Sequence, residues 1–198
     1  MSLVIAQAGS REAVIGGDQR CITFLGSCTQ LEEELYSGRI KNDEALLTRA
    51  RELGATLQVS DGRVKVWRRG DLLVGEVTEL SSRLERRRRI YLAPGARLEA
   101  DICGGEARIR ARGGVGCVVF GNRFTQELAG SSVARAGGRV NEELIRSIFV
   151  EAGERTASVS QQHIILKSGN VPADPGAALQ RALQEDCQIS GWILCDPQ

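Results

Sequence analysis

The sequence predicts an α+β fold organised as a single domain. Short apolar runs separated by glycine-containing turns indicate strands, and several longer segments repeat apolar residues at helical spacing. The chain has 198 residues, of which 42% are hydrophobic and 26% charged. This length supports one well-buried core, whereas two full domains would be cramped. We therefore expect residues 1–198 to form one domain.

The composition argues against several classes of protein. A net charge of +1 gives no general attraction to nucleic acid or to a membrane surface. No apolar stretch approaches the roughly 18 residues of a spanning helix, and the first apolar run lacks the basic lead of a secretion signal. The six cysteines are scattered without a C-x-x-C pair, so we expect no metal, cofactor or disulfide framework. A cytoplasmic protein without a nucleic-acid partner or membrane insertion is the expectation.

The first third of the chain alternates between strand and helix patterns. Two apolar runs flank a glycine and polar cluster at the N-terminus, which predicts a hairpin. A cap at Asn42 or Asp43 is expected to begin the second helix. Strands are expected at residues 3–8, 13–18 and 21–24, and helices at residues 29–36 and 42–54.

The remainder of the chain is expected to be richer in strands. Residues 56–59 and 63–67 alternate apolar and polar side chains around Ser60-Asp61-Gly62, which predicts a second hairpin. Further strands are expected at residues 72–77, 90–92, 97–102, 115–120, 163–167 and 192–195, and helices at residues 123–129, at 141–152 and from residue 174.

Ser2 carries the most direct chemical signal. Removal of Met1 is expected before so small a residue, and it would leave Ser2 with a free α-amine. That amine titrates near ~7.7 to 8, low enough to take the proton from the neighbouring hydroxyl at neutral pH. Asp18 and Arg20 follow in the second strand and could orient this nucleophile. The alternative interpretation is an ordinary second residue and an ordinary surface ion pair.

This layout resembles the N-terminal nucleophile (Ntn) hydrolases, in particular proteasome β subunits. Those chains begin with Thr and end their second strand with a small-small-Asp-x-Arg signature. Here Ser2 takes the Thr position without a gap, and Gly16-Gly17-Asp18-Gln19-Arg20 supplies the signature. The resemblance implies an Ntn-hydrolase-like αββα sandwich. Residues of about 25–82 would then be a helical and hairpin insertion after the second strand.

The resemblance also implies roles for other residues. Proteasome-like chains carry a catalytic Lys just before an Ile/Leu-aromatic strand, and Arg89-Ile90-Tyr91 falls where that motif is expected. Arg89 would stay charged, so it could depress the pKa of the nucleophile's amine and stabilise an oxyanion but could not shuttle a proton. Gly104 or Gly105 would donate a backbone N–H to the oxyanion.

Two weaker candidates and one histidine complete the expected site. Glu154 and Ser158 are the nearest matches to the Asp and Ser that orient the nucleophile in proteasome-like chains. His163 begins an apolar run and is expected to be structural.

A closer resemblance comes from residues 31–47, LEEELYSGRIKNDEALL, together with Gly75-Glu76-Val77 and the arginine run before Ile90. Over residues 2 to about 170 the chain is similar to connectase, the proteasome-related protein ligase of methanogenic archaea. The resemblance implies a transpeptidase that cuts a Lys-Asp-Pro-Gly-Ala motif after the Asp. Its protein substrate would be one of the proteins that make up a methanogen methyltransferase, and the part upstream of the cut would pass to a peptide beginning Pro-Gly-Ala. Most of the C-terminal domain of longer family members is expected to be absent.

Two other functions stay open at this stage. One is a proteasome-like peptidase with the same N-terminal serine, in which water attacks the acyl-enzyme. The other is a non-catalytic binding module on an Ntn scaffold, suggested by the arginine at position 89. A ligase must admit a second folded partner, so a monomer or small oligomer is expected.

Overall fold

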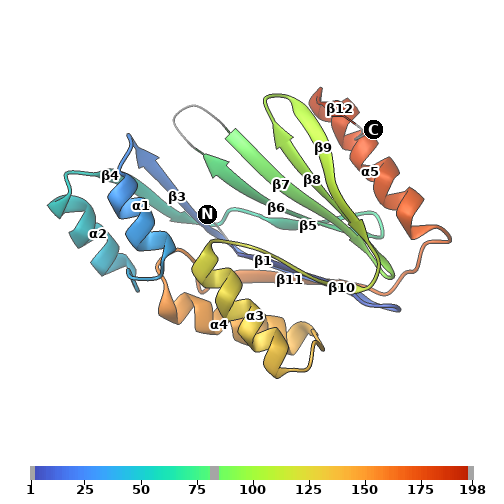
Figure 1. The fold of residues 1–198 in the computed structure, drawn as a ribbon, viewed down its shortest axis with the longest axis horizontal. Helices are drawn as coiled ribbons and strands as arrows, with labels where there is room; N and C mark the ends of the chain where they lie inside the picture. The colour runs from blue at the N-terminus through green and yellow to red at the C-terminus, as the bar shows by residue number, and fades with distance from the viewer. Residues whose placement is uncertain (1–2, 81–84, 196–198) are drawn as a thin grey trace.

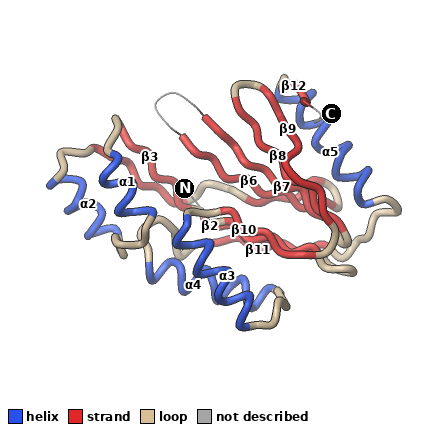
Figure 2. Tube along the Cα trace, viewed as in Figure 1, coloured by secondary structure: helices blue, strands red, loops and turns tan. Residues whose placement is uncertain are grey.

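The computed structural model describes residues 3–80 and 85–195, and over these residues the chain forms three sheets and five helices (Figures 1 and 2). The strands are β1 (Val4–Ala8), β2 (Ala13–Asp18), β3 (Arg20–Leu25), β4 (Thr56–Asp61), β5 (Val66–Arg69), β6 (Leu72–Leu80), β7 (Glu85–Ala93), β8 (Ala96–Cys103), β9 (Glu106–Gly113), β10 (Gly116–Phe120), β11 (His163–Ser168) and β12 (Ile193–Cys195). The helices are α1 (Thr29–Tyr36), α2 (Asp43–Glu52), α3 (Arg123–Arg135), α4 (Glu142–Arg155) and α5 (Pro175–Ser190).

The N-terminal strands form the middle of a four-stranded antiparallel sheet. Its order is β10-β1-β2-β11, so the predicted hairpin of the first two strands is confirmed. Val4 pairs with Gly17 on one side and with Phe120 on the other. The start of the chain is thereby fixed between two strands that are distant from each other in sequence.

The second sheet has six strands in the order β12-β9-β8-β7-β6-β5. Strands β5 to β9 follow one another as antiparallel neighbours, and β12 joins the edge parallel to β9. The hairpin predicted from residues 56–59 and 63–67 is wrong, because β4 pairs with β3 and β5 pairs with β6. The alternation there is correct for two strands, but they belong to different sheets.

A third, two-stranded sheet of β3 and β4 lies beside α1 and α2 (Figure 1). These elements share their own apolar cluster, in which Leu31, Leu35 and Leu46 are fully buried. The stretch of about 25–82, expected as an insertion, thus contributes to two places. Its first part builds this separate layer, and its last part supplies β5 and β6 to the six-stranded sheet.

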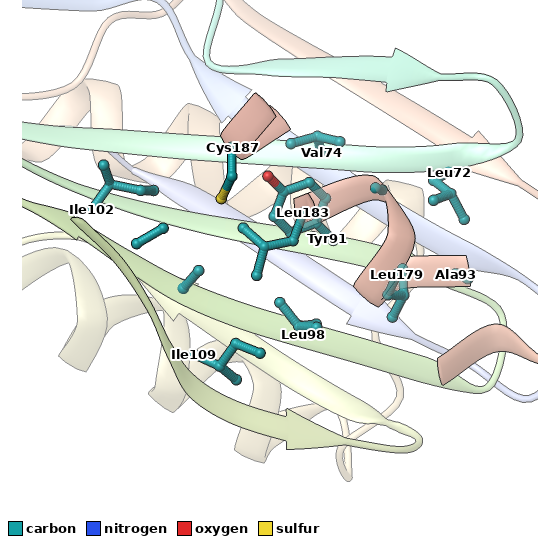
Figure 3. Close-up of a cluster of buried hydrophobic side chains, with 13 residues drawn as sticks. Leu72, Val74, Tyr91, Ala93, Leu98, Ile102, Ile109, Leu179, Leu183 and Cys187 are labelled. Atoms are coloured by element: carbon teal, nitrogen blue, oxygen red, sulfur yellow. The ribbon is translucent and has the colours of Figure 1, made fainter. Parts of the chain in front are cut away.

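The two larger sheets pack face to face, with apolar side chains from β1, β2, β6 and β7 between them. Helices α3 and α4 cover the outer face of the four-stranded sheet. Helix α5 packs on the outer face of the six-stranded sheet, where Leu179, Leu183 and Cys187 meet side chains of β6 to β9 (Figure 3). The chemistry of the chain is therefore divided among three buried interfaces.

The predicted Ntn-hydrolase-like αββα sandwich is wrong as a description of this fold. The described residues form a strand-rich chain of twelve strands and five helices. A separate two-stranded sheet lies outside the two larger ones, and a single helix packs on the outer face of the six-stranded sheet. The physical reason is the long antiparallel run from β5 to β9, which buries its alternating apolar residues without a helical layer between strands. The fold class is α+β, with sheet predominating.

Capping residues begin four of the helices. The Asn42, Asn122 and Asn141 side chains each accept a hydrogen bond from the amide three residues later, and Asp174 does the same for α5. Asp174-Pro175-Gly176-Ala177 is therefore a helix start, in which the proline lies in the first turn. Of the two caps expected for α2, Asn42 is the one used.

Candidate active site

Asp18 ends β2 and is fully buried. One carboxylate oxygen accepts hydrogen bonds from the Leu3 amide at 2.7 Å and from the Lys65 ammonium at 2.8 Å. The other accepts from the Arg20 amide at 2.8 Å and from the Ser160 amide at 3.4 Å. A buried carboxylate with four donors is held rigidly, so it fixes the backbone at the start of β1.

Lys65 is the residue that sequence reasoning missed. It lies just before β5, is only 2% exposed, and donates from Nζ to Asp18 and, at 2.7 Å, to the Arg20 carbonyl oxygen. Burial lowers the pKa of Lys65 below its ordinary value, and the charge of Asp18 offsets part of that effect. A signal was available, because Lys65-Val66-Trp67 also places a basic residue before an apolar-aromatic strand.

The glycines of the signature allow this close packing on both faces of β2. A methyl group on Gly16 would lie 2.6 Å from side-chain atoms of Ile145 and Phe149 in α4. A methyl group on Gly17, on the opposite face, would lie 2.9 Å from Val66 Cγ1 and 3.3 Å from Lys65 Cβ. Only a residue without a side chain lets β5 approach so closely, which brings Lys65 to Asp18.

Gly17→Ala is therefore expected to overpack the site. We expect it to lower the free energy of unfolding by about 1–3 kcal/mol, because Val66 and Lys65 must shift. Urea unfolding followed by tryptophan fluorescence measures this change. Gly130→Ala is the matched control, since a methyl group on this α3 residue meets no atom within 4 Å and should be tolerated. Equal behaviour of the two variants would contradict the packing argument.

Arg20 acts as a cross-link between layers. Its guanidinium makes a bidentate pair with Asp61 at 2.8 and 3.1 Å, and it also contacts Asp43 and the Ala157 carbonyl oxygen. Asp43 begins α2 and Asp61 ends β4. The Arg20 side chain thus attaches the two-stranded layer to the core, whereas its backbone N–H and C=O contact Asp18 and Lys65.

The serines after α4 form a second part of the site. Ser160 is fully buried, and its amide reaches Asp18 while its hydroxyl accepts from the Gln19 amide at 3.1 Å. Ser158, the expected orienting residue, lies two positions earlier and its hydroxyl contacts Asn122 and Thr156. Glu154 is exposed near the end of α4. Among the described contacts of Asp18, Ser160 takes the place that was expected for Ser158.

Arg89 lies on the other face of the six-stranded sheet. Its guanidinium donates to Glu76 at 2.6 and 2.8 Å and to Asp186 of α5 at 2.6 Å, and it lies 4.9 Å from the ring centroid of Trp192. The neighbouring Tyr91 packs in the same interface with α5 (Figure 3). Arg89 is therefore placed beneath α5, whereas the Asp18–Lys65 pair lies between the larger sheets.

Arg89→Met tests the role of this buried ionic cluster. We expect the free energy of unfolding to fall by about 3 kcal/mol, because Glu76 loses its cationic partner in a largely buried setting. Thermal or urea unfolding measures the loss. The expected chemistry at Asp18 should persist in the folded fraction. Loss of that chemistry with unchanged stability would instead favour a direct catalytic role for Arg89.

Gly104 and Gly105 form the turn between β8 and β9, with positive φ values of 58° and 81°. Lys65 lies at the start of β5, and β8 is three strands further across the sheet. Three strand spacings correspond to about 14 Å. The structure therefore does not bring these glycines together with Asp18 and Lys65.

Three further observations bear on what the site contains. Ser2 lies outside the described residues, one peptide bond before Leu3. His163 stacks on Phe149 with ring centroids 5.1 Å apart. Within residues 3–80 and 85–195, no group of His, Cys, Asp and Glu side chains is suited to a metal ion, and no helix is long and apolar enough to cross a membrane.

A strand-rich α+β domain with a buried lysine–aspartate pair attached to its first strand defines a site built at the start of the chain. The chain belongs to the connectase family: the family model described as "Connectase MJ0548-like, N-terminal domain" matches residues 1–188. The resemblance drawn from the sequence is thereby confirmed. Among curated proteins no match is found. Membership indicates a connectase-like function, that of an enzymatic protein ligase acting on protein substrates.

Proposed function

We propose that the chain transfers peptides by forming a covalent intermediate on Ser2, with an Asp-Pro bond in a Lys-Asp-Pro-Gly-Ala-type motif as its substrate. The observation that carries the proposal is the hydrogen bond from the Leu3 amide to Asp18, which is paired with Lys65. Ser2 is bonded to that amide, so the nucleophile is tethered to the Asp18–Lys65 pair. Family membership supports the ligase activity.

The chemistry requires removal of Met1. The α-amine of Ser2 then takes the hydroxyl proton while the oxygen attacks the carbonyl carbon of the substrate Asp. The C–N bond to proline breaks, and the proline nitrogen receives the proton from the amine. The buried cation of Lys65 favours the neutral amine and the developing oxyanion, because like charge opposes protonation of the amine. Asp18 holds Lys65 and the Leu3 backbone in place.

The same residue explains transfer instead of hydrolysis. An ester on the Ser2 oxygen lies beside the freed amine, so the acyl group can migrate to nitrogen through a five-membered ring. The resulting amide resists water. When a peptide beginning Pro-Gly-Ala arrives, the acyl group returns to oxygen and passes to the positioned proline nitrogen. Proximity supplies up to roughly 7–11 kcal/mol to this amine, an advantage that bulk water does not share.

A time course by mass spectrometry tests the proposal. Purified chain is mixed with a peptide that contains Lys-Asp-Pro-Gly-Ala, and a second peptide beginning Pro-Gly-Ala is added later. We expect a lasting conjugate that carries the upstream part of the substrate, followed by a ligated product. Steady accumulation of the free Asp-ended acid without a conjugate would instead establish the peptidase.

The non-catalytic module loses its main support. It was motivated by an arginine at position 89 where a lysine was expected, and Lys65 supplies a buried lysine beside Asp18. In the proposed mechanism Arg89 and Arg20 hold α5 and the two-stranded layer in place. If no conjugate forms although Ser2 is fully exposed by Met1 removal, the binding module becomes the better description.

A further inference from the structure

Three arginines surround Asp101 on the inner side of the six-stranded sheet, and we call this group the Asp101 arginine cluster. Arg86 contacts Asp101 Oδ2 at 2.6 Å, Arg110 contacts the same atom at 3.3 Å, and Arg88 lies 3.5 Å from Oδ1. The neighbours Ala100 and Ile102 face α5. Asp101 and its arginines therefore occupy the opposite face, toward the four-stranded sheet.

The cluster carries an excess of positive charge. Burial raises the pKa of Asp101, but the hydrogen bond from Arg86 and the charges of Arg88 and Arg110 outweigh it and hold that pKa below its ordinary value. Asp101 is therefore ionised, and one negative charge faces three guanidinium groups. A further anion would balance the cluster better than any neutral group.

Two buried atoms of the cluster still lack hydrogen bonds. Within the described residues, Arg88 Nε and Asp101 Oδ1 are buried without a hydrogen-bond partner, although they face each other at 3.5 Å. An unpaired buried donor is costly, and native structures commonly satisfy such groups with a ligand. A ligand oxygen near Arg88 would supply the acceptor.

The cluster lies next to the start of β1. The Arg88 guanidinium is 5.5 Å from the ring centroid of Phe120. Phe120 is the cross-strand partner of Val4, and both pack in the apolar cluster between the two larger sheets. Directly opposed residues in antiparallel strands have Cα atoms about 4.5–5.5 Å apart. The excess positive charge thus lies near the end of the chain where Ser2 precedes Leu3.

We propose that the Asp101 arginine cluster is a subsite that binds an acidic side chain of the peptide substrate close to the bond that is cut. The proposal rests on the proposed function, because it takes the occupant to be a peptide handled at Ser2. Charge complementarity favours a carboxylate, and the position beside β1 favours a residue near the reacting carbonyl. Arg88 is the central residue, since it contacts both Asp101 and Phe120.

Binding without turnover tests this subsite. The Ser2→Ala chain is titrated with fluorescent peptides that contain either Lys-Asp-Pro-Gly-Ala or Lys-Asn-Pro-Gly-Ala, and anisotropy is recorded. We expect the Asp peptide to bind at least about tenfold more tightly than the Asn peptide, with the difference shrinking in high salt. Adding Arg88→Gln should remove that difference while leaving the binding of the Asn peptide unchanged.

The controls separate this inference from the proposed function. Arg123→Gln is the matched variant, since this exposed α3 arginine pairs only with Glu127 among its described salt bridges. It should keep the full preference. If Arg88→Gln fails to fold, Arg86→Gln, whose side chain is 38% exposed, replaces it. Equal binding of the two peptides, or an equal loss for both in Arg88→Gln, overturns the subsite whether or not Ser2 is the nucleophile. Tighter Arg88-dependent binding of an oligonucleotide than of the Asp peptide also overturns it.

Discussion

Ser2→Ala is expected to abolish the covalent conjugate and to slow peptide transfer by about three orders of magnitude or more. The reason is that alanine keeps the α-amine and the backbone but has no oxygen to attack the substrate carbonyl. The loss should occur without a change in stability, because the Leu3 amide, which contacts Asp18, is untouched. Intact-mass measurement of the chain after incubation with a Lys-Asp-Pro-Gly-Ala peptide provides the readout.

Two controls make this result interpretable. The intact mass of the purified chain must show that Met1 has been removed, because a retained Met1 leaves no free amine on Ser2. Ser2→Thr keeps a hydroxyl beside the amine and should retain measurable conjugate. An undiminished conjugate in Ser2→Ala would place the nucleophile on another residue.

Lys65→Met is expected to have the second largest effect, on stability as well as on transfer. It removes the cation that faces the fully buried Asp18 carboxylate, and leaving such a charge unpaired costs about 3–5 kcal/mol. Transfer should also fail in the folded fraction, because Asp18 no longer positions the start of β1 beside a cation. Urea unfolding and the conjugate assay measure the two effects separately.

A double variant distinguishes charge from packing at this position. In Asp18→Asn combined with Lys65→Met no buried charge remains, so part of the lost stability should return although transfer stays absent. A Lys65→Met chain that is as stable and as active as the parent chain would show that the buried pair is unimportant. A double variant less stable than the single one would show that packing dominates.

The pH dependence of stability offers an independent readout of Lys65. Burial lowers the pKa of Lys65 in the folded chain, whereas the unfolded chain keeps a value of about 10.4. Between these two values the unfolded chain binds the proton more strongly, so rising pH favours the folded state. The difference in free energy of unfolding between the parent chain and Lys65→Met should therefore grow from about pH 7 to about pH 10. A constant difference would contradict the lowered pKa.

Residues identified from the sequence differ in how directly the structure uses them. The Asp18 position follows from the signature because two glycines before it must accept α4 on one face and β5 on the other. Arg20 belongs to the same signature, yet its side chain bonds Asp43 and Asp61, which could not be read from spacing. Ser158 and Ser160 are both buried serines of one loop, and only the fold selects Ser160 for Asp18.

By itself, the sequence determined the family, the N-terminal hairpin and the helix caps, since each depends on neighbouring residues or on blocks in a given order. Only the tertiary structure decided between Lys65 and Arg89. Both are basic residues two positions before an aromatic residue of a strand, so their local patterns are alike. Alternation along a strand assigns side chains to two faces but does not say which face meets which layer. Packing of β5 against Gly17 turns Lys65 toward Asp18, whereas α5 covers the face that carries Arg89.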